Sequence, residues 1–236
     1  MVAALPLRLM GATLRRRGRN LVGPVDLTVG TEGITAVIGP NGSGKTSLLR
    51  MMHGLQRVAA GQVTWSMPEV EARTRQAYVF QQPIALRRTV LANLAFPLRL
   101  RGLTRRAAEA RARDQAARFD LADKLPRQAP SLSGGEMQRL ALARALITEP
   151  EILFADEPCA ALDGRATREI EALLVAASAQ TRIVVATHDM GQARRIASDV
   201  IFLLHGRVHE ASPAPAFFAA PRTPEAAAFL KGDIVE

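Results

Sequence analysis

The chain has 236 residues, of which 48% are apolar, and its 31 basic and 22 acidic side chains give a formal net charge of +9. This length and composition suit one folded domain with a sizeable core and exclude an intrinsically disordered chain. No stretch reaches the roughly 18–20 unbroken apolar residues of a membrane-spanning helix, and the first residues lack the pattern of a secretory leader. The single cysteine, Cys159, excludes an internal disulfide. We therefore expect a cytosolic protein.

Most of the positive charge is arginine, and part of it gathers in the middle of the chain. Eight arginines fall between residues 87 and 113, whereas the whole chain has three lysines. One interpretation is a basic surface that meets nucleotide, nucleic acid or the anionic leaflet of a membrane. The other is a solvated helix face in an arginine- and alanine-rich sequence. The composition leaves both open.

Apolar runs and turn residues predict the elements in chain order. Strands are expected at residues 34–38, 61–65, 76–80, 152–155 and 182–187, with a hairpin that joins 200–204 to 207–208. Helices are expected at 45–53, 90–98 and 105–119, after Gly135, at 167–177 and from Pro224. Residues 84–146 form a mostly helical insertion between the strands. Strands that alternate with helices predict an α/β fold with a mainly parallel sheet covered on both faces.

A glycine-rich turn follows the first of these strands and matches the phosphate-binding pattern GxxxxGK[ST]. It consists of Gly39, Pro40, Asn41, Gly42, Ser43, Gly44, Lys45 and Thr46. Glycines let the backbone curl so that successive N–H groups point at one phosphate, and the helix that begins at Lys45 adds its positive end. We expect Lys45 to reach the β- and γ-phosphates of ATP and the Thr46 hydroxyl to ligate Mg²⁺. A glycine-rich turn without a ligand is the alternative.

Two carboxylates end the strand predicted at residues 152–155. Asp156 at the edge of the sheet can bind Mg²⁺ through water, which leaves Glu157 to polarise the attacking water as a general base. Alone, an apolar run followed by Asp-Glu is weak evidence, but a phosphate-binding loop upstream strengthens it. His188 follows the next strand and can hydrogen-bond the γ-phosphate. A lone histidine at a strand end is more often structural, and the context favours the functional interpretation.

A second glycine pair opens a helix far from the first loop. In the segment LSGGEMQR, Ser133 can cap the helix while Gly134 and Gly135 expose N–H groups to an anion. A second phosphate site on one chain is unexpected, and a resemblance of this segment to a known family explains it. The segment resembles the signature motif of the ABC transporter ATPase family, which binds the γ-phosphate of ATP held by a partner subunit. The resemblance implies a head-to-tail dimer of two copies of the chain around two ATP molecules.

The resemblance covers nearly the whole chain, with the motifs in the family's order. Gln81 is similar to the Q-loop glutamine, which in the family reaches Mg²⁺ and the water, with Gln82 as the fallback. Asp163 ends a segment similar to the D-loop, and His188 matches the switch histidine. The resemblance implies ATP and Mg²⁺ as cofactors and ATP hydrolysis as the activity. It also implies one domain over residues 1–236, with a P-loop NTPase core, an N-terminal antiparallel β region and a helical subdomain at about 84–146.

Two positions depart from the family's pattern. The family usually places an aromatic residue about two dozen positions before the phosphate-binding loop, where it stacks on adenine, but the matching segment here has none. Arg16 lies nearest that place, so we expect its guanidinium to stack on the base, with Arg15 and Arg17 within the uncertainty of the alignment. Solvated arginines are the alternative. Cys159 stands where threonine is common, and we interpret it as a small filler.

A separate cassette of this kind resembles the ATP-binding component of a bacterial importer. Its partners would be an integral-membrane permease and, indirectly, a periplasmic solute-binding protein, which places the chain at the cytoplasmic face of the cell membrane. Residues 86–90 are our candidate contact with the permease. Several stretches resemble cassettes of importers for tungstate or a related oxyanion, whereas phosphate and amino-acid importers are the alternatives.

A non-transport ABC ATPase that acts on nucleic acid is a remote alternative. A chromosome-maintenance ATPase normally places long coiled coils between the two phosphate-binding motifs, and this interval has no sustained heptads. A translation-associated protein normally carries two cassettes in one chain. We therefore expect no nucleic-acid partner.

Overall fold

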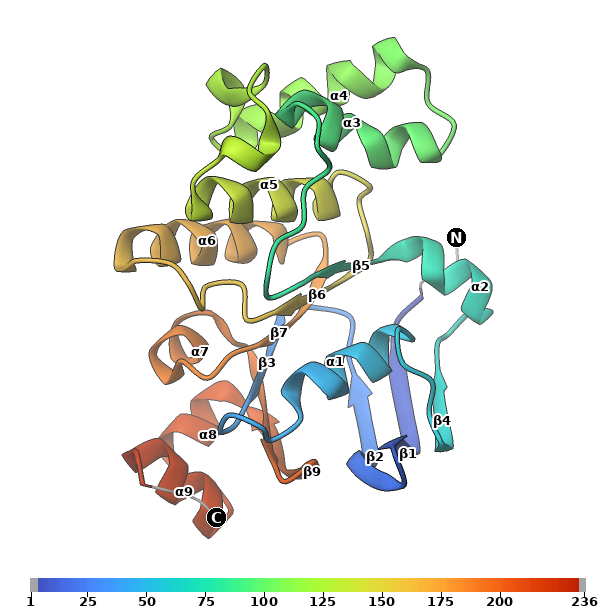
Figure 1. Cartoon of the computed structure of the whole chain (residues 1–236). Coiled ribbons are helices and arrows are strands. Elements are labelled where there is room, and N and C mark those ends of the chain that lie inside the picture. Colours follow the sequence, from blue (N-terminus) through green and yellow to red (C-terminus); the bar gives the residue numbers. More distant parts are fainter. Residues whose placement is uncertain (1–3, 234–236) are drawn as a thin grey trace.

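Two β-sheets organise residues 4–233, the part of the chain that this computed structural model describes (Figure 1). The smaller sheet is antiparallel and has the order β2-β1-β4. Its strands are β1 (Leu7–Arg16), β2 (Arg19–Val29) and β4 (Ala60–Thr64). The strand expected at residues 61–65 is β4, and it pairs with β1 rather than with the parallel strands.

The larger sheet has six strands in the order β5-β6-β7-β3-β8-β9. Its strands are β3 (Ile34–Ile38), β5 (Gln76–Val79), β6 (Ile152–Asp156), β7 (Arg182–Ala186), β8 (Asp199–Leu204) and β9 (Arg207–Pro213). All neighbours are parallel except the β8–β9 hairpin. The predicted α/β fold with a mainly parallel sheet is confirmed, and β9 runs farther than residues 207–208.

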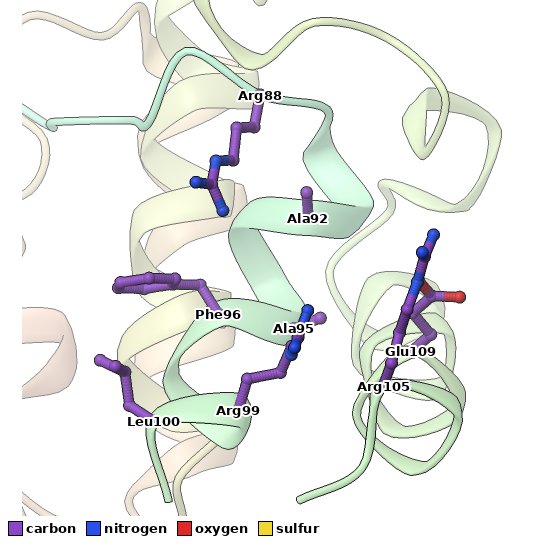
Figure 2. A pocket seen from close by; sticks show the side chains of 8 residues that line it. All are labelled: Arg88, Ala92, Ala95, Phe96, Arg99, Leu100, Arg105 and Glu109. Atoms are coloured by element: carbon purple, nitrogen blue, oxygen red, sulfur yellow. The ribbon is translucent and has the colours of Figure 1, made fainter. Parts of the chain in front are cut away.

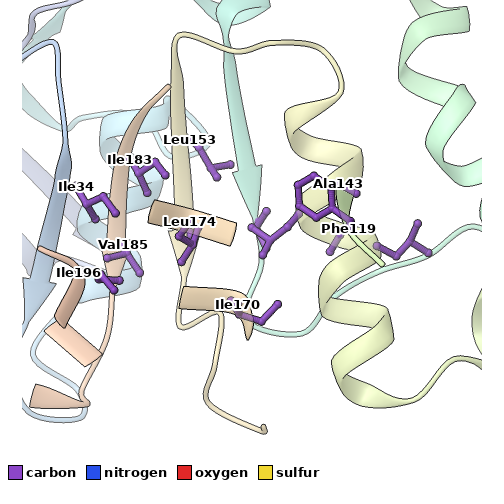
Figure 3. Close-up of a cluster of buried hydrophobic side chains, with 14 of the residues drawn as sticks. Ile34, Phe119, Ala143, Leu153, Ile170, Leu174, Ile183, Val185 and Ile196 are labelled. Atoms are coloured by element: carbon purple, nitrogen blue, oxygen red, sulfur yellow. The ribbon is translucent and has the colours of Figure 1, made fainter. Parts of the chain in front are cut away.

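Both faces of this sheet are buried, because successive side chains of a strand point to opposite sides. In β6, Leu153 and Ala155 join one core cluster, whereas Ile152 and Phe154 join the other. The first cluster lies under α5, α6 and α7 (Figure 3). The second lies between the sheet, α1 and the antiparallel sheet. Asp156, two residues after Phe154, therefore falls on the face that carries α1.

Nine α-helices of very different length accompany the strands within the described residues, and the last two of them follow β9 (Figure 1). They are α1 (Lys45–His53), α2 (Glu69–Ala72), α3 (Val90–Leu100), α4 (Arg105–Arg118), α5 (Gly134–Leu146), α6 (Gly164–Ala177), α7 (Met190–Ile196), α8 (Ala214–Ala219) and α9 (Pro224–Lys231). Within residues 4–233, none of them is both long and apolar enough to cross a membrane.

Helix caps explain where two helices depart from their predicted bounds. The Asp163 side chain accepts a hydrogen bond from the Ala166 amide at 2.8 Å, so α6 begins at Gly164 rather than at 167. Ser133 and Glu136 form a capping box, and α5 therefore begins at Gly134 rather than after Gly135. The short helices α7 and α8 were not predicted.

Candidate active site

The phosphate-binding loop joins the end of β3 to the start of α1 and is shaped by glycines with positive φ. Gly39, Gly42 and Gly44 have φ angles of 150°, 81° and 104°. A Cβ atom on Gly39 would lie 2.0 Å from the carbonyl oxygen of Leu203, so a side chain cannot fit there. The buried hydroxyl of Ser43 has no hydrogen-bond partner within the described chain and can donate to an added anion. These features fit a nucleotide phosphate.

Lys45 is folded back into this loop. Its Nζ atom donates to the carbonyl oxygens of Gly39 at 2.9 Å and Pro40 at 3.1 Å, and it lies 3.8 Å from Oε1 of Glu157. Burial lowers the pKa of Lys45, while the Glu157 and Asp156 carboxylates oppose this shift. The ammonium group is thus held within the loop, where a phosphate can replace its carbonyl partners.

Thr46 and Asp156 meet although they are 110 residues apart in the sequence. The Thr46 hydroxyl donates to Oδ1 of Asp156 at 2.9 Å, and Asp156 itself is 1% exposed. A hydroxyl beside a buried carboxylate, next to a phosphate-binding loop, is the donor set that fits Mg²⁺ shared with a nucleotide. Within residues 4–233, no three or more His, Cys, Asp or Glu side chains are grouped so that they could hold a metal ion by themselves.

Asp156 has a second partner that the sequence did not indicate. The Tyr78 hydroxyl donates to its other oxygen, Oδ2, at 3.0 Å. Burial, first, and then the Asp156 carboxylate raise the pKa of Tyr78, so the phenol stays protonated. Tyr78 lies on β5 and packs into the same core cluster as Phe154. Finding it from the sequence requires the strand order, because only the neighbourhood of β5 and β6 brings Tyr78 next to Asp156.

Glu157 and His188 lie just beyond the ends of β6 and β7. Nδ1 of His188 is 3.1 Å from Oε2 of Glu157. The backbone of Glu157 has a positive φ of 46°, and its amide donates to the Ala186 carbonyl at 3.0 Å. This conformation is rare for a residue with a side chain and typical of functional sites. The predicted general base and the predicted γ-phosphate ligand therefore sit together beside Lys45.

Gln81 lies outside this group. Strand β5 ends at Val79, so Gln81 does not follow the strand directly as expected. Its side chain is exposed, and within residues 4–233 no hydrogen bond joins it to the other site residues. Gln82 is also exposed. The contact of Gln81 with Mg²⁺ and water therefore stays a prediction.

The segment after Gln81 is held by the buried side chain of Asn93 and the half-buried side chain of Arg144. The Asn93 side chain accepts from the Leu86 amide at 2.8 Å and donates to the Leu86 carbonyl at 3.1 Å. Arg144 of α5 donates to Oδ1 of Asn93 at 3.3 Å and to the Ile84 carbonyl. The helix that begins with Gly134 is thereby tied to the segment that we consider as a permease contact.

The two predicted anion sites lie apart on this chain. In Figure 1, α6 and α7 lie between α5 and the loop that precedes α1. At the start of α5, Ser133 accepts from the Glu136 amide at 3.4 Å, and its own amide donates to the Glu136 carboxylate at 2.8 Å. Ser133, Gly134 and Asp163 are exposed or half-buried at the surface, as is Gly135. One chain therefore cannot bring both motifs to the same phosphate.

Arg16 lies at the tip of the β1–β2 hairpin. Farther along β2, Val22 packs against Gly44 of the phosphate-binding loop. A Cβ atom on Gly44 would lie 2.8 Å from Cγ2 of Val22, a residue of β2. Arg16 pairs with Arg19 across the hairpin, and both are exposed. Arg15 instead donates to Oδ1 of Asn20 at 2.8 Å. Arg16 is thus free of the internal bond that Arg15 makes, and its stacking on adenine stays a prediction.

Cys159 is half-buried near Glu157 and His188. Burial raises the pKa of its thiol to about 11, which makes it a poor nucleophile. It lines a hollow of about 200 Å³ together with Gln192 and Thr167. This environment agrees with the interpretation of Cys159 as a filler.

Comparisons with known proteins identify the relatives of this arrangement. The model of the family described as ABC transporter matches residues 22–160. The chain is 36% identical to the tungstate uptake system ATP-binding protein TupC of Peptoclostridium acidaminophilum, over 82% of this chain and 92% of the relative. It is 36% identical to the L-cystine transport system ATP-binding protein TcyN of Escherichia coli, over 91% and 92%. It is 37% identical to a phosphate import ATP-binding protein, PstB 1, of Gloeobacter violaceus, over 84% and 82%.

Two solved structures share the fold. The chain cbiO1 of Clostridium perfringens, part of an ABC transporter complex, aligns with a TM-score of 0.84 and 24% identity over 92% of both chains. A dimeric ATP-binding cassette in a post-hydrolysis state, bound to ADP and Pi, aligns with a TM-score of 0.79 and 27% identity. That match covers 88% of this chain and 98% of the other.

Proposed function

Since the chain belongs to the ABC transporter family and is an ATPase of the importer type, we propose that it works as a head-to-tail dimer beneath a permease that imports a small oxyanion. The observation that carries this proposal is the separation of the start of α1, which holds Lys45, from the start of α5, which Ser133 caps (Figure 1). Each chain offers a phosphate-binding loop with a general base and, elsewhere, an exposed helix N-terminus. Two copies in opposite orientation complete two sites from these halves.

The contacts support the following roles within each proposed site. The loop that contains Ser43 and Lys45 binds the β- and γ-phosphates. Mg²⁺, when bound by Thr46 and Asp156, neutralises charge on these phosphates. Glu157 takes a proton from the attacking water, and His188 orients Glu157 from 3.1 Å away and contacts the γ-phosphate. Ser133, Gly134 and Gly135 of the second copy, which lie at its surface, bind the same phosphate.

We propose the chain as one functional cassette in which α3, α4 and α5 face the permease. A hollow of about 430 Å³ lies between α3 and α4, and Figure 2 shows Arg88, Phe96 and Arg105 on its walls. Leu100, which lines it, is 73% exposed, and Ile84, in the segment before α3, is 64% exposed. An amphipathic cytoplasmic helix of the permease fits this surface, since apolar residues would cover the exposed side chains and acidic ones would meet the arginines. The chain would then be held at the cytoplasmic face of the membrane.

The oxyanion is the finer part of the proposal. Relatives of similar identity are named for tungstate, L-cystine and phosphate, and others for sulfate or thiosulfate and for methionine. Oxyanions make up three of these five classes, and the stretches that resemble tungstate cassettes favour tungstate among them. Phosphate and amino acids remain the alternatives.

Deletion of the gene in the cell that carries it tests the proposal. We expect tungsten content, measured by elemental analysis at nanomolar external tungstate, to fall in the deletion strain and to recover with the wild-type gene. The Glu157→Gln variant is the matched control, because it should bind ATP without restoring uptake. Normal tungsten content together with lost uptake of phosphate or an amino acid would reject the oxyanion. Normal uptake of all these solutes would reject the importer function.

A further inference from the structure

Asp156 is a buried carboxylate that receives one side-chain hydrogen bond on each oxygen. Thr46 donates to Oδ1 at 2.9 Å and Tyr78 to Oδ2 at 3.0 Å. The torsion about the Cβ–Cγ bond of an aspartate is broad, so one bond alone leaves the carboxylate plane free to turn. Two bonds from opposite sides, one from α1 and one from β5, fix it. The Thr46 side is the side on which Mg²⁺ is proposed, and the Tyr78 side is not.

The Tyr78 ring is itself held in place by aromatic neighbours. His53 of α1 packs edge-on against it with ring centroids 5.5 Å apart, and Phe80 follows at 4.7 Å. Phe154 of β6 stacks with it at 6.5 Å. Burial lowers the pKa of His53 to about 4, so this neighbour is neutral. The hydroxyl therefore has a fixed position, and a phenol is a proton donor at neutral pH.

We propose that Tyr78 is a positioning residue for the Mg²⁺ site: its hydroxyl holds Oδ2 of Asp156, so that Oδ1 stays directed at Thr46 and at the metal. The inference rests on the proposed Mg²⁺ site and adds to it a residue outside the phosphate-binding motifs. Besides Asp156, the Tyr78 hydroxyl interacts with Arg50 of α1, and within residues 4–233 no hydrogen bond joins it to the phosphate-binding loop or to Glu157. Its link to the proposed metal site is therefore Asp156. We therefore expect a change at Tyr78 to weaken Mg²⁺ binding and to leave nucleotide binding in the absence of Mg²⁺ unchanged.

The coupling between metal and nucleotide affinity measures this effect without turnover. The affinity for AMP-PNP, a non-hydrolysable ATP analogue, is measured by calorimetry with Mg²⁺ and with EDTA. We expect Tyr78→Phe to leave the affinity in EDTA unchanged and to reduce the gain from Mg²⁺ by about threefold to tenfold, the net effect of one typical hydrogen bond. Asp156→Asn should reduce the gain as well, and the double variant should lose little more, because Tyr78 acts through Asp156.

Val79→Ala is the matched control for a loss of packing. Val79 is the next residue of β5 and is 2% exposed, but its side chain enters the core cluster on the other face of the sheet. This variant should lower the melting temperature while keeping the full gain from Mg²⁺. An equal loss of the gain in Val79→Ala and Tyr78→Phe would overturn the proposal, because the effect would then be general destabilisation.

The wild-type protein offers a second measurement that needs no change at Tyr78. The chain has one tyrosine, so protein labelled with ¹³C at the tyrosine Cζ gives a single NMR signal. We expect this signal to shift when Mg²⁺ is added to the AMP-PNP complex and to shift in Asp156→Asn. A signal that responds to neither overturns the inference even if Tyr78→Phe fails to fold. A wild-type protein whose AMP-PNP affinity gains nothing from Mg²⁺ would instead reject the Mg²⁺ site itself.

Discussion

Nδ1 of His188 lies 3.1 Å from Oε2 of Glu157, just beyond the ends of the neighbouring strands β7 and β6. The pair forms because the carboxyl ends of parallel strands meet at one edge of the sheet. The positive φ of Glu157 turns its side chain toward this edge, where Lys45 is 3.8 Å away. The proposed general base, the imidazole beside it and the ammonium of the phosphate-binding loop thus lie together at one edge of the sheet.

Replacement of the proposed general base separates binding from hydrolysis. We expect Glu157→Gln to bind ATP with Mg²⁺ normally and to lose hydrolysis by at least about a hundredfold, because a carboxamide cannot take a proton from water. Lys45 and Asp156 still hold the nucleotide and metal. Phosphate release and equilibrium binding measure the two properties. A rate close to that of the wild type would reject the role of Glu157.

Gly39 should tolerate no side chain. Its φ of 150° and the 2.0 Å that would separate the Leu203 oxygen from an added Cβ make alanine strained and crowded. We expect Gly39→Ala to lower the free energy of unfolding by at least about 1–3 kcal/mol and to weaken ATP binding. The matched control is Gly30→Ala, where the added atom meets nothing within 4 Å and the change should stay within about 0.5 kcal/mol. Equal denaturant midpoints for the two variants would contradict this view of the loop.

Arg16 should contribute to the binding of adenine. We expect Arg16→Ala to weaken ATP binding about threefold to fivefold and Arg16→Tyr to restore it, since a guanidinium over an aromatic ring gains roughly 0.5–2 kcal/mol. Calorimetry with ATP measures the effect. The value of kcat should hardly change, because the adenine ring of ATP is far from the γ-phosphate. Arg15→Ala is the control, since Arg15 is bonded to Asn20. Equal affinity in the wild type and both Arg16 variants would remove this residue from the site.

Residues 81–89 should become protected when the permease binds. This segment is anchored on one side by Asn93 and Arg144, and Arg87 and Arg88 lie at the surface. We expect slower hydrogen exchange there in the purified complex than in the isolated chain, measured by mass spectrometry, with little change in the C-terminal helix α9. Unchanged exchange in 81–89 would place the interface elsewhere.

The sequence indicated the central sheet well because each strand of its interior is a short apolar run. Residues 34–38 were predicted with the bounds that β3 has, and residues 45–53 with those of α1. The hairpin tip His205-Gly206 was also recognised, since His205 and Gly206 have positive φ and suit a two-residue turn.

Contacts between strands distant in sequence were beyond prediction. Tyr78 was interpreted only as a strand residue, because its bond to Asp156 depends on β5 lying next to β6. Strand 61–65 could not be assigned to the antiparallel sheet, because its pairing with β1 is set by tertiary packing. Helices α7 and α8 have seven and six residues, too few for a clear helical period.

Activity in mixtures of two inactive variants tests the composite site most directly. Ser133→Arg places a bulky charge where the partner's γ-phosphate would bind, and Lys45→Ala removes the phosphate-binding ammonium; each variant alone should be inactive, and Ser133→Arg should still bind ATP as a monomer. Mixed in equal amounts, they form dimers in which one site has both an intact Lys45 and an intact Ser133. The account predicts activity well above that of either variant alone, up to about a quarter of the wild-type rate if dimers form at random and sites work independently. Wild-type hydrolysis by Ser133→Arg alone, or a mixture no more active than its components, would contradict it.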